Sequence, residues 1–192
     1  QALEDKDYLL ADSLLADIIT EFPSRPEAHL YRAQSRYWLK DYEQALYHLS
    51  LANPPSQQMG RAEILRAYCH YNLGEIDKAR YIMEDIVLHY EELRDSARAF
   101  LVSYHKEVEN FSQAHALLSG RLEDRPRAYV FAERALVALE LGNVQEAIDD
   151  FSSAIDLDSQ QVEYYWQRAI LHGEGGEYDK AIADYDKAIA LD

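Results

Sequence analysis

Apolar residues recur along this chain at positions i, i+3, i+4 and i+7, with polar residues between them. In the stretch "NVQEAIDDFSSAI" (143–155), Val144, Ala147, Ile148, Phe151 and Ala154 share one face of a helix. This spacing is typical of an amphipathic α-helix, because one helical turn takes 3.6 residues. The pattern therefore predicts an all-α protein in which each helix buries one face.

The same pattern returns with a fixed period. Six segments carry an alanine between an aromatic or aliphatic residue three positions earlier and an apolar residue four positions later. These alanines are Ala11, Ala45, Ala79, Ala114, Ala147 and Ala181. They lie 33 to 35 residues apart. Such a period predicts a stacked array of one repeated supersecondary unit.

A second helix is expected ahead of each alanine segment. Four units carry an Arg-Ala pair 12 residues before the recurrent alanine, at Arg32-Ala33, Arg66-Ala67, Arg134-Ala135 and Arg168-Ala169, and the remaining unit has Leu101-Val102 there. Each unit is thus predicted to be two antiparallel helices, whose small residues allow the helix axes to approach closely.

A tight turn should join the two helices of each unit. Gly74, Gly142 and Gly176 fall at this turn, where a left-handed residue commonly ends a helix. Lys40 and Glu109 replace the glycine in two units, which we expect to cost some local stability.

This chain resembles the tetratricopeptide repeat family in repeat length, small residues, turn glycines and aromatic positions. The stretch "YYWQRAILHGEGGEYDKAIADYDKAIALD" (164–192) follows the family pattern throughout, whereas Pro54 and Pro55 should end one second helix early. The resemblance implies a right-handed α-solenoid of antiparallel helix pairs. We expect a single repeat domain with full repeats at 26–59, 60–94, 95–127, 128–161 and 162–192, preceded by the second helix of a truncated repeat (1–25). We also expect the sequence to be a fragment of a longer chain.

The resemblance further implies that the first helix of each pair lines a concave groove. The groove residues would then be Tyr31, Gln34, Tyr37, Trp38, Arg61, Tyr68, Tyr71, Asn72, Ser103, Lys106, Tyr129 and Trp166. Tyrosine and tryptophan offer large rigid contact areas with a polar end, which suits recognition of a peptide or helix. The alternative is that these rings only pack between neighbouring first helices.

The predicted function is therefore that of a protein–protein interaction scaffold that docks a partner peptide or helix. The net charge of −16 favours partners with basic residues and argues against nucleic acid, whose phosphates it would repel. No apolar run is long enough for direct membrane insertion. The terminal helices could also associate with another copy of the chain.

Catalysis and metal binding have little support in the sequence. None of the seven histidines pairs with another at the i, i+4 spacing of a helical zinc site, and His29 and His48 are expected on different helices. Asp149 and Asp150 are neighbours that we expect to face solvent. Cys69 occupies a place that other repeats fill with Ser, Tyr, Val or Leu, so it is interpreted as a packing residue. We predict that the chain is not an enzyme and that it binds neither a metal ion nor a cofactor.

Two other functions stay open. The chain could be a regulatory or substrate-recruiting repeat region of a larger enzyme, or a bacterial envelope assembly factor. A single cysteine gives only a slight preference for a cytoplasmic location, and a periplasmic one fits if a signal was removed.

Overall fold

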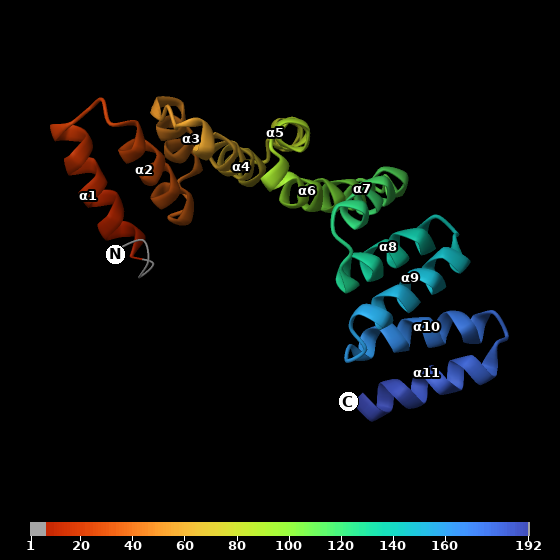
Figure 1. The fold of residues 1–192 in the computed structure, drawn as a ribbon. Helices are drawn as coiled ribbons and strands as arrows, with labels where there is room; N and C mark the ends of the chain where they lie inside the picture. Colours follow the sequence, from red (N-terminus) through yellow and green to blue (C-terminus); the bar gives the residue numbers. More distant parts are fainter. Residues whose placement is uncertain (1–6, 192) are drawn as a thin grey trace. The chain divides into compact units, whose positions relative to one another are not determined.

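The computed structural model describes residues 7–191 and, within them, eleven α-helices and one short 3-10 helix, with no strand. The predicted all-α class is confirmed (Figure 1). The helices are α1 (Tyr8–Glu21), α2 (Pro26–Trp38), α3 (Tyr42–Leu51), α4 (Ser56–Asn72), α5 (Ile76–His89), η1 (Glu91–Leu93), α6 (Arg94–Glu107), α7 (Phe111–Asp124), α8 (Ala128–Glu140), α9 (Val144–Leu157), α10 (Val162–Glu174) and α11 (Tyr178–Leu191).

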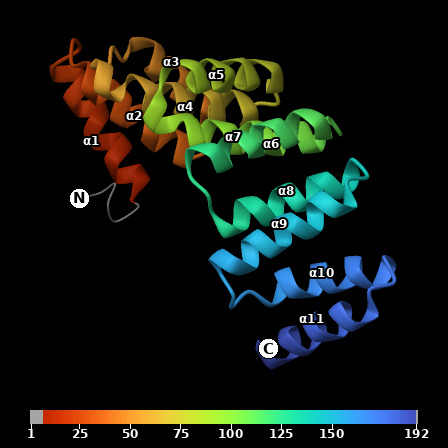
Figure 2. The same ribbon diagram turned by 45° about the vertical axis from the view of Figure 1, so that its right-hand side comes forward.

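The helices form two compact units. The first unit ends at Ala97 and the second begins at Arg98. In the first unit α2 packs on α3 and α4 packs on α5, while in the second α8 packs on α9 and α10 on α11. Within the second unit, α7, α8, α9, α10 and α11 follow one another side by side in chain order (Figures 1 and 2). The expected repeat boundaries stay a prediction.

Capping side chains mark where several second helices begin. The carboxylates of Asp7 and Asp41 accept hydrogen bonds from the backbone N–H groups three residues later, at 3.1 and 3.3 Å. Asn110 does the same at the start of α7. These contacts satisfy backbone donors that the first helical turn leaves unpaired.

The turns between paired helices have the predicted left-handed residue. Gly74, Gly142 and Gly176 have φ angles of 77–78°, and Lys40 and Glu109 adopt the same region at 63° and 56°. The predicted turn is thus confirmed at the three glycines. It also occurs at Lys40 and Glu109, where a residue with a side chain adopts the left-handed conformation.

The recurrent alanines are the centre of the helix packing. Those of the five complete helix pairs are at most 5% exposed, and Ala11 is also buried. Leu118 packs in one cluster with Ala114, and Phe151 in another with Ala147. Cys69 is fully buried against the cluster that contains Leu49, and burial raises the pKa of its thiol to about 11. Its interpretation as a packing residue is confirmed.

Candidate functional site

In the first unit, the proposed groove residues lie on α2 and α4. Trp38, Tyr31 and Tyr71 are exposed at 59%, 43% and 40%. Arg61 and Asn72 are also exposed. Gln34, Tyr37 and Tyr68 are half-buried. The first helices of this unit therefore present large aromatic side chains to solvent.

An aromatic cluster surrounds Trp38. The ring of Tyr8 stacks on it at 5.6 Å between centroids, and Tyr37 meets it edge-on at 5.4 Å. Tyr37 also packs against Tyr42 on α3. Its side chain hydrogen-bonds to Asn72, which links α2 to α4. Burial raises the pKa of the Tyr37 phenol. Tyr37 is thus mainly a structural support for the more exposed Trp38.

The contribution of Tyr8 was not foreseen in the sequence. Tyr8 lies on α1, in the helix of the truncated repeat, and is half-buried. The repeat pattern assigns groove positions to first helices, so it carries no signal for a ring that a second helix contributes.

In the second unit, the proposed groove residues have more intramolecular partners. Lys106 lies 3.5 Å from Glu133, which lies 3.5 Å from Arg121. Arg121 donates a hydrogen bond to the hydroxyl of Tyr129 at 3.1 Å, and Arg127 donates another at 2.7 Å. The two hydrogen bonds to its hydroxyl hold the Tyr129 ring in place, although the ring itself is exposed.

The remaining two proposed groove residues of this unit lie apart in the chain. The hydroxyl of Ser103 donates to the carbonyl of Ala99 in its own helix. Trp166 is exposed and meets Tyr185 edge-on at 5.1 Å, so its ring is braced by α11. Both side chains present a free surface that a partner could contact.

Arginine–aspartate contacts join three successive helices in the second unit. Arg134 on α8 donates to both carboxylate oxygens of Asp150 on α9, at 2.8 and 2.7 Å, and to the Ser119 hydroxyl on α7 at 3.1 Å. This set of three side chains is called the Arg134 clasp below. The hydrogen bond to Asp150 raises the pKa of Arg134. Bidentate arginine–carboxylate pairs are among the stronger hydrogen-bonded contacts.

The same clasp recurs one repeat later. Arg168 on α10 donates to Asp184 on α11 at 2.8 and 2.7 Å, and to Ser152 on α9 at 2.8 Å. The prediction that Asp150 faces solvent is therefore wrong, since Asp150 is 3% exposed, whereas Asp149 is exposed as expected. Adjacent helix residues diverge, so one of two neighbouring acids can be buried while the other is not.

Two histidines of the first unit meet in its interior. His29 on α2 and His48 on α3 are buried, with their Nδ1 atoms 3.0 Å apart. The Nε2 of His29 lies 3.4 Å from the carbonyl oxygen of Pro23. If His29 donates there, its Nδ1 is the acceptor for the Nδ1–H of His48. Burial, reinforced by Arg32, lowers the pKa of His48 to about 4.

This pair is a structural contact rather than a metal site. Within residues 7–191, no group of three or more His, Cys, Asp or Glu side chains is placed to hold a metal ion. His29 and His48 lie on different helices, as expected, and their contact across the turn has no counterpart in the spacing of residues within one helix.

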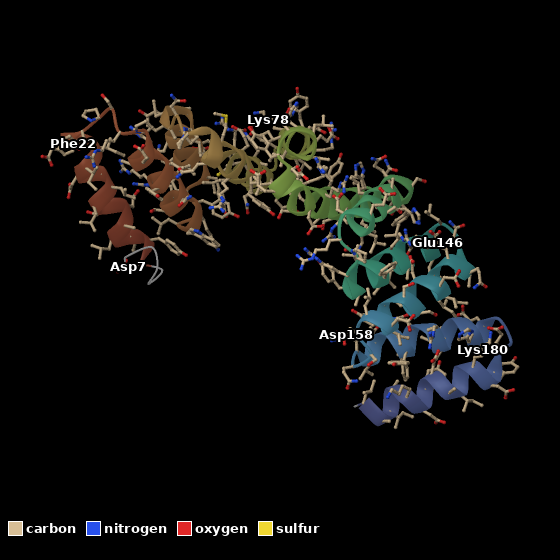
Figure 3. The ribbon with its side chains drawn as sticks, in the orientation of Figure 1. Asp7, Phe22, Lys78, Glu146, Asp158 and Lys180 are labelled. Carbon is tan, nitrogen blue, oxygen red and sulfur yellow. The ribbon has the colours of Figure 1, made fainter. Side chains whose placement is uncertain are left out.

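A polar cleft lies between α9, α10 and α11. Its lining includes Asp149, Arg168, His172, Glu177 and Lys180. Several of these groups already pair with one another, because Glu177 accepts hydrogen bonds from His172 at 2.6 Å and from Lys180 at 2.8 Å. Lys180 lies at the beginning of α11 (Figure 3). The cleft therefore has little unmet capacity to bind a charged ligand.

Membrane insertion can be judged from helix length and polarity. Among the described helices, none combines the length and the apolar character that crossing a bilayer requires.

Known proteins resemble this chain in both sequence and fold. A family model described as tetratricopeptide repeat matches residues 101–162 and 132–192. The DnaJ homolog subfamily C member 7 homolog of Dictyostelium discoideum is 24% identical over 99% of this chain. The chain spans only 32% of the length of that relative.

Solved structures extend the similarity of fold along the chain. The C-terminal part of a TPR repeat-containing protein from Cytophaga hutchinsonii has a TM-score of 0.84 at 16% identity, over 99% of this chain and 76% of that one. YrrB, described as a TPR protein with an unusual peptide-binding site, has a TM-score of 0.68 at 15% identity, over 92% and 91% of the two chains.

Proposed function

We propose, from the premise that this chain belongs to the tetratricopeptide repeat family, that it is a protein-interaction scaffold whose first-helix face docks a partner peptide or helix. One observation carries the proposal. Trp38, Tyr31 and Tyr71 are large aromatic side chains held on α2 and α4, and each is more than a third exposed. Rigid, exposed aromatic residues supply contact area at a low cost in side-chain entropy.

The partner is expected to be an extended segment or an amphipathic helix with basic residues. The chain carries a net charge of −16, which attracts such a segment and speeds its encounter at low salt. Gln34 is half-buried and Arg61 is exposed, and both could donate hydrogen bonds to the backbone of a partner. Tyr129 and Trp166 would provide similar contacts in the second unit.

Recognition of a free C-terminal carboxylate does not fit this chain. In family members that grip such a group, lysine, asparagine and arginine stand at set positions of the groove. The matching positions here are Leu30, Gln34, Leu65 and Ala99. Leu30 is buried in the core of the first unit, so it presents nothing to a carboxylate. Binding of a chaperone's C-terminal tail through such a clamp is therefore not part of the proposed function.

The test compares aromatic residues on first and second helices. A variant with Tyr31→Ala, Trp38→Ala and Tyr71→Ala removes the exposed rings of α2 and α4. The matched control, Tyr47→Ala with Tyr81→Ala, removes rings of α3 and α5 that are 55% and 70% exposed. Pull-down of partners by each protein is quantified, with helical content checked by circular dichroism.

Loss of capture by the first variant alone is the expected result. Equal capture by the first variant, the control and the unchanged chain would refute the proposal. Loss in the control alone would assign binding to the second helices. Tyr37 is left unchanged, because its packing against Tyr42 and Trp38 makes it a structural residue.

A further inference from the structure

Arg66 on α4 lacks the acidic partner that the corresponding arginines of the second unit have. Arg134 and Arg168 each donate two hydrogen bonds to an aspartate 16 residues later in the chain. Ile82 stands 16 residues after Arg66, so α5 supplies no carboxylate at this place. The Nε of Arg66 is buried and makes no hydrogen bond among the described residues.

Neighbouring polar side chains do not replace the missing aspartate. Glu63 lies 3.3 Å from the Nε of Arg66 without hydrogen-bonding to it. Ser50 stands where Ser152 of the second unit accepts a hydrogen bond from an arginine, but the Ser50 hydroxyl donates to the carbonyl oxygen of Tyr47 in its own helix. The Arg66 side chain is 34% exposed, so a group from outside the chain can approach its guanidinium. Because a buried donor without an acceptor is costly, an acceptor that reaches Arg66 is bound favourably.

A cavity lies beside this position, between the end of α4 and the beginning of α5. It has a volume of about 460 Å³, and its lining is formed by His70, Asp77, Lys78, Arg80, Tyr81 and Ile82. Lys78 marks its place on α5 (Figure 3). In the second unit, the aspartate at the place of Ile82 lies 2.7 Å from Arg168. The repeat therefore puts Ile82, and with it the cavity, next to Arg66.

The charge around this cavity differs from that of the whole chain. Residues 61–82 hold 4 basic and 3 acidic residues, a net charge of 4 − 3 = +1, whereas the chain carries −16. Lys78 and Arg80 each have a hydrogen-bonded acid, whereas the Nε of Arg66 has none. The combination of apolar walls with an arginine that lacks its acid fits a segment that carries an apolar side chain next to a carboxylate.

We propose that Arg66 binds an aspartate or glutamate side chain of a partner protein, and that an apolar side chain next to this acid enters the cavity between α4 and α5. The partner's carboxylate takes the place relative to Arg66 that Asp150 and Asp184 take relative to the arginines of the second unit. A contact between arginine and carboxylate is among the stronger hydrogen-bonded contacts, so one acid gives this surface its specificity.

This surface is separate from the aromatic first-helix face. Arg66 lies on the side of α4 that is turned toward the second helices, as Arg134 does in contacting Ser119 and Asp150. Tyr71 follows five residues later, about 140° further round the same helix. A segment bound at Arg66 does not require the exposed rings of the first-helix face, so the two proposals can fail independently.

The test is an NMR titration of the side-chain N–H signals of isotope-labelled arginine in the 192-residue chain. The probe is the blocked dipeptide acetyl-glutamyl-leucine amide, and its neutral glutaminyl counterpart is the control probe at equal ionic strength. The Arg66 signal is assigned by its absence from Arg66→Gln. It should shift and saturate with the glutamyl dipeptide, with a dissociation constant on the order of 10 mM, and stay unchanged with the glutaminyl one. The signal of Arg125, an exposed arginine, should not saturate.

A variant that supplies the acid within the chain should block the site. Ile82→Asp places a carboxylate where the second unit has one, so it should weaken binding of the glutamyl dipeptide by about ten-fold or more. The matched control is Ile182→Asp, the same change at an isoleucine on α11 that is 58% exposed, and it should leave the titration unchanged. Circular dichroism checks that both variants are folded.

Three results would overturn the proposal. The first is a titration in which the Arg66 signal does not saturate, or responds equally to both dipeptides. This comparison uses the unchanged chain, so it holds even if a variant does not fold. The second is undiminished binding by folded Ile82→Asp. The third is saturation of the signal by inorganic phosphate where the glutamyl dipeptide gives none, which would assign the site to a phosphate group.

Discussion

Replacing Asp150 by alanine is expected to lower the free energy of unfolding of the second unit by about 3 kcal/mol. The Asp150 side chain is 5% exposed and accepts two hydrogen bonds from Arg134. Its removal leaves a guanidinium that is 20% exposed and keeps only the hydrogen bond to Ser119. Breaking one partner of a buried pair typically costs 3–5 kcal/mol, and the residual exposure of Arg134 places this case near the lower limit.

A double replacement separates the cost of an unpaired charge from the worth of the pair. Changing both Arg134 and Asp150 to leucine should leave stability within about 1 kcal/mol of the unchanged chain, because an apolar pair can replace a buried ion pair at little cost. The protein already contains this arrangement. Leu101 and Leu117 stand at the corresponding positions of the preceding repeat, and Leu101 is 3% exposed.

The assay follows urea unfolding through tryptophan fluorescence. The chain has two tryptophans, Trp38 in the first unit and Trp166 in the second. In a Trp38→Phe background, the signal therefore reports the second unit alone. The control is Asp149→Ala, which removes the neighbouring, exposed carboxylate and should change stability by less than about 0.5 kcal/mol.

Two results would contradict this reasoning. If Asp150→Ala costs no more than Asp149→Ala, the Arg134 clasp makes no net contribution to stability. If the double leucine variant is as unstable as Asp150→Ala, the loss comes from packing at these positions and not from an unpaired charge.

Three further predictions concern the first unit. Because unfolded His48 takes up a proton near pH 6.5 while the folded pKa is about 4, stability should fall by about 3 kcal/mol as the pH drops from 6.5 to 4. Urea midpoints that are flat across this range would refute it, and His48→Gln should remove the slope. Lys40→Gly should stabilise the unit by about 1 kcal/mol, since Lys40 has a φ of 63°. The reciprocal change Gly74→Lys should destabilise the unit by a similar amount, and thermal unfolding of both variants measures the effect. Unchanged melting temperatures in both variants would show that a side chain at the left-handed turn costs no stability. Cys69, with a pKa of about 11, should react far more slowly with iodoacetamide in the folded protein than in urea. Equal rates would show that the thiol is accessible.

Features set by local rules were predictable from the sequence. The turn glycines, the buried alanines and the early end of α3 before Pro54 each depend on a few neighbouring residues, and all were found. The burial of Cys69 followed from comparing equivalent positions, since a place that accepts both serine and leucine is a packing place. The period of the repeat was enough to convert these local features into an all-α array.

Contacts between helices were harder to predict. The pattern within one helix does not show that Asp150 is buried, because its partner Arg134 lies 16 residues earlier, on another helix. The i, i+4 spacing applies within one helix, so it carries no signal for His29 and His48, which lie 19 residues apart on two helices. The exposed aromatic residues of α2 could be proposed from the repeat pattern. The stacking of Tyr8 on Trp38 required the position of a further helix.

In this repeat, residues 16 apart in the sequence face each other across the two helices of one unit, as Arg134 and Asp150 do. The pairs at this separation, each starting just before the small residue of the first helix, are Arg32 and His48, Arg66 and Ile82, Leu101 and Leu117, Arg134 and Asp150, and Arg168 and Asp184. Only the last two arginines meet an acid at this separation, and only these two form the bidentate contact.

The first two arginines of this series must find other partners. Arg32 donates to Asp12 of the preceding helix, at 3.0 Å. The Nε of Arg66 lies 3.3 Å from a carboxylate oxygen of Glu63 in its own helix, but among the described residues this buried Nε makes no hydrogen bond. Neither arginine has an acid 16 residues later, and Asp12 pairs better with Arg32 than Glu63 does with Arg66. Because an unsatisfied buried donor is costly, we expect Arg66 to contribute less to stability than Arg134 and Arg168 do. Arg36, which lies outside this series, forms the bidentate contact of the first unit, with Asp12 at 2.7 and 2.6 Å.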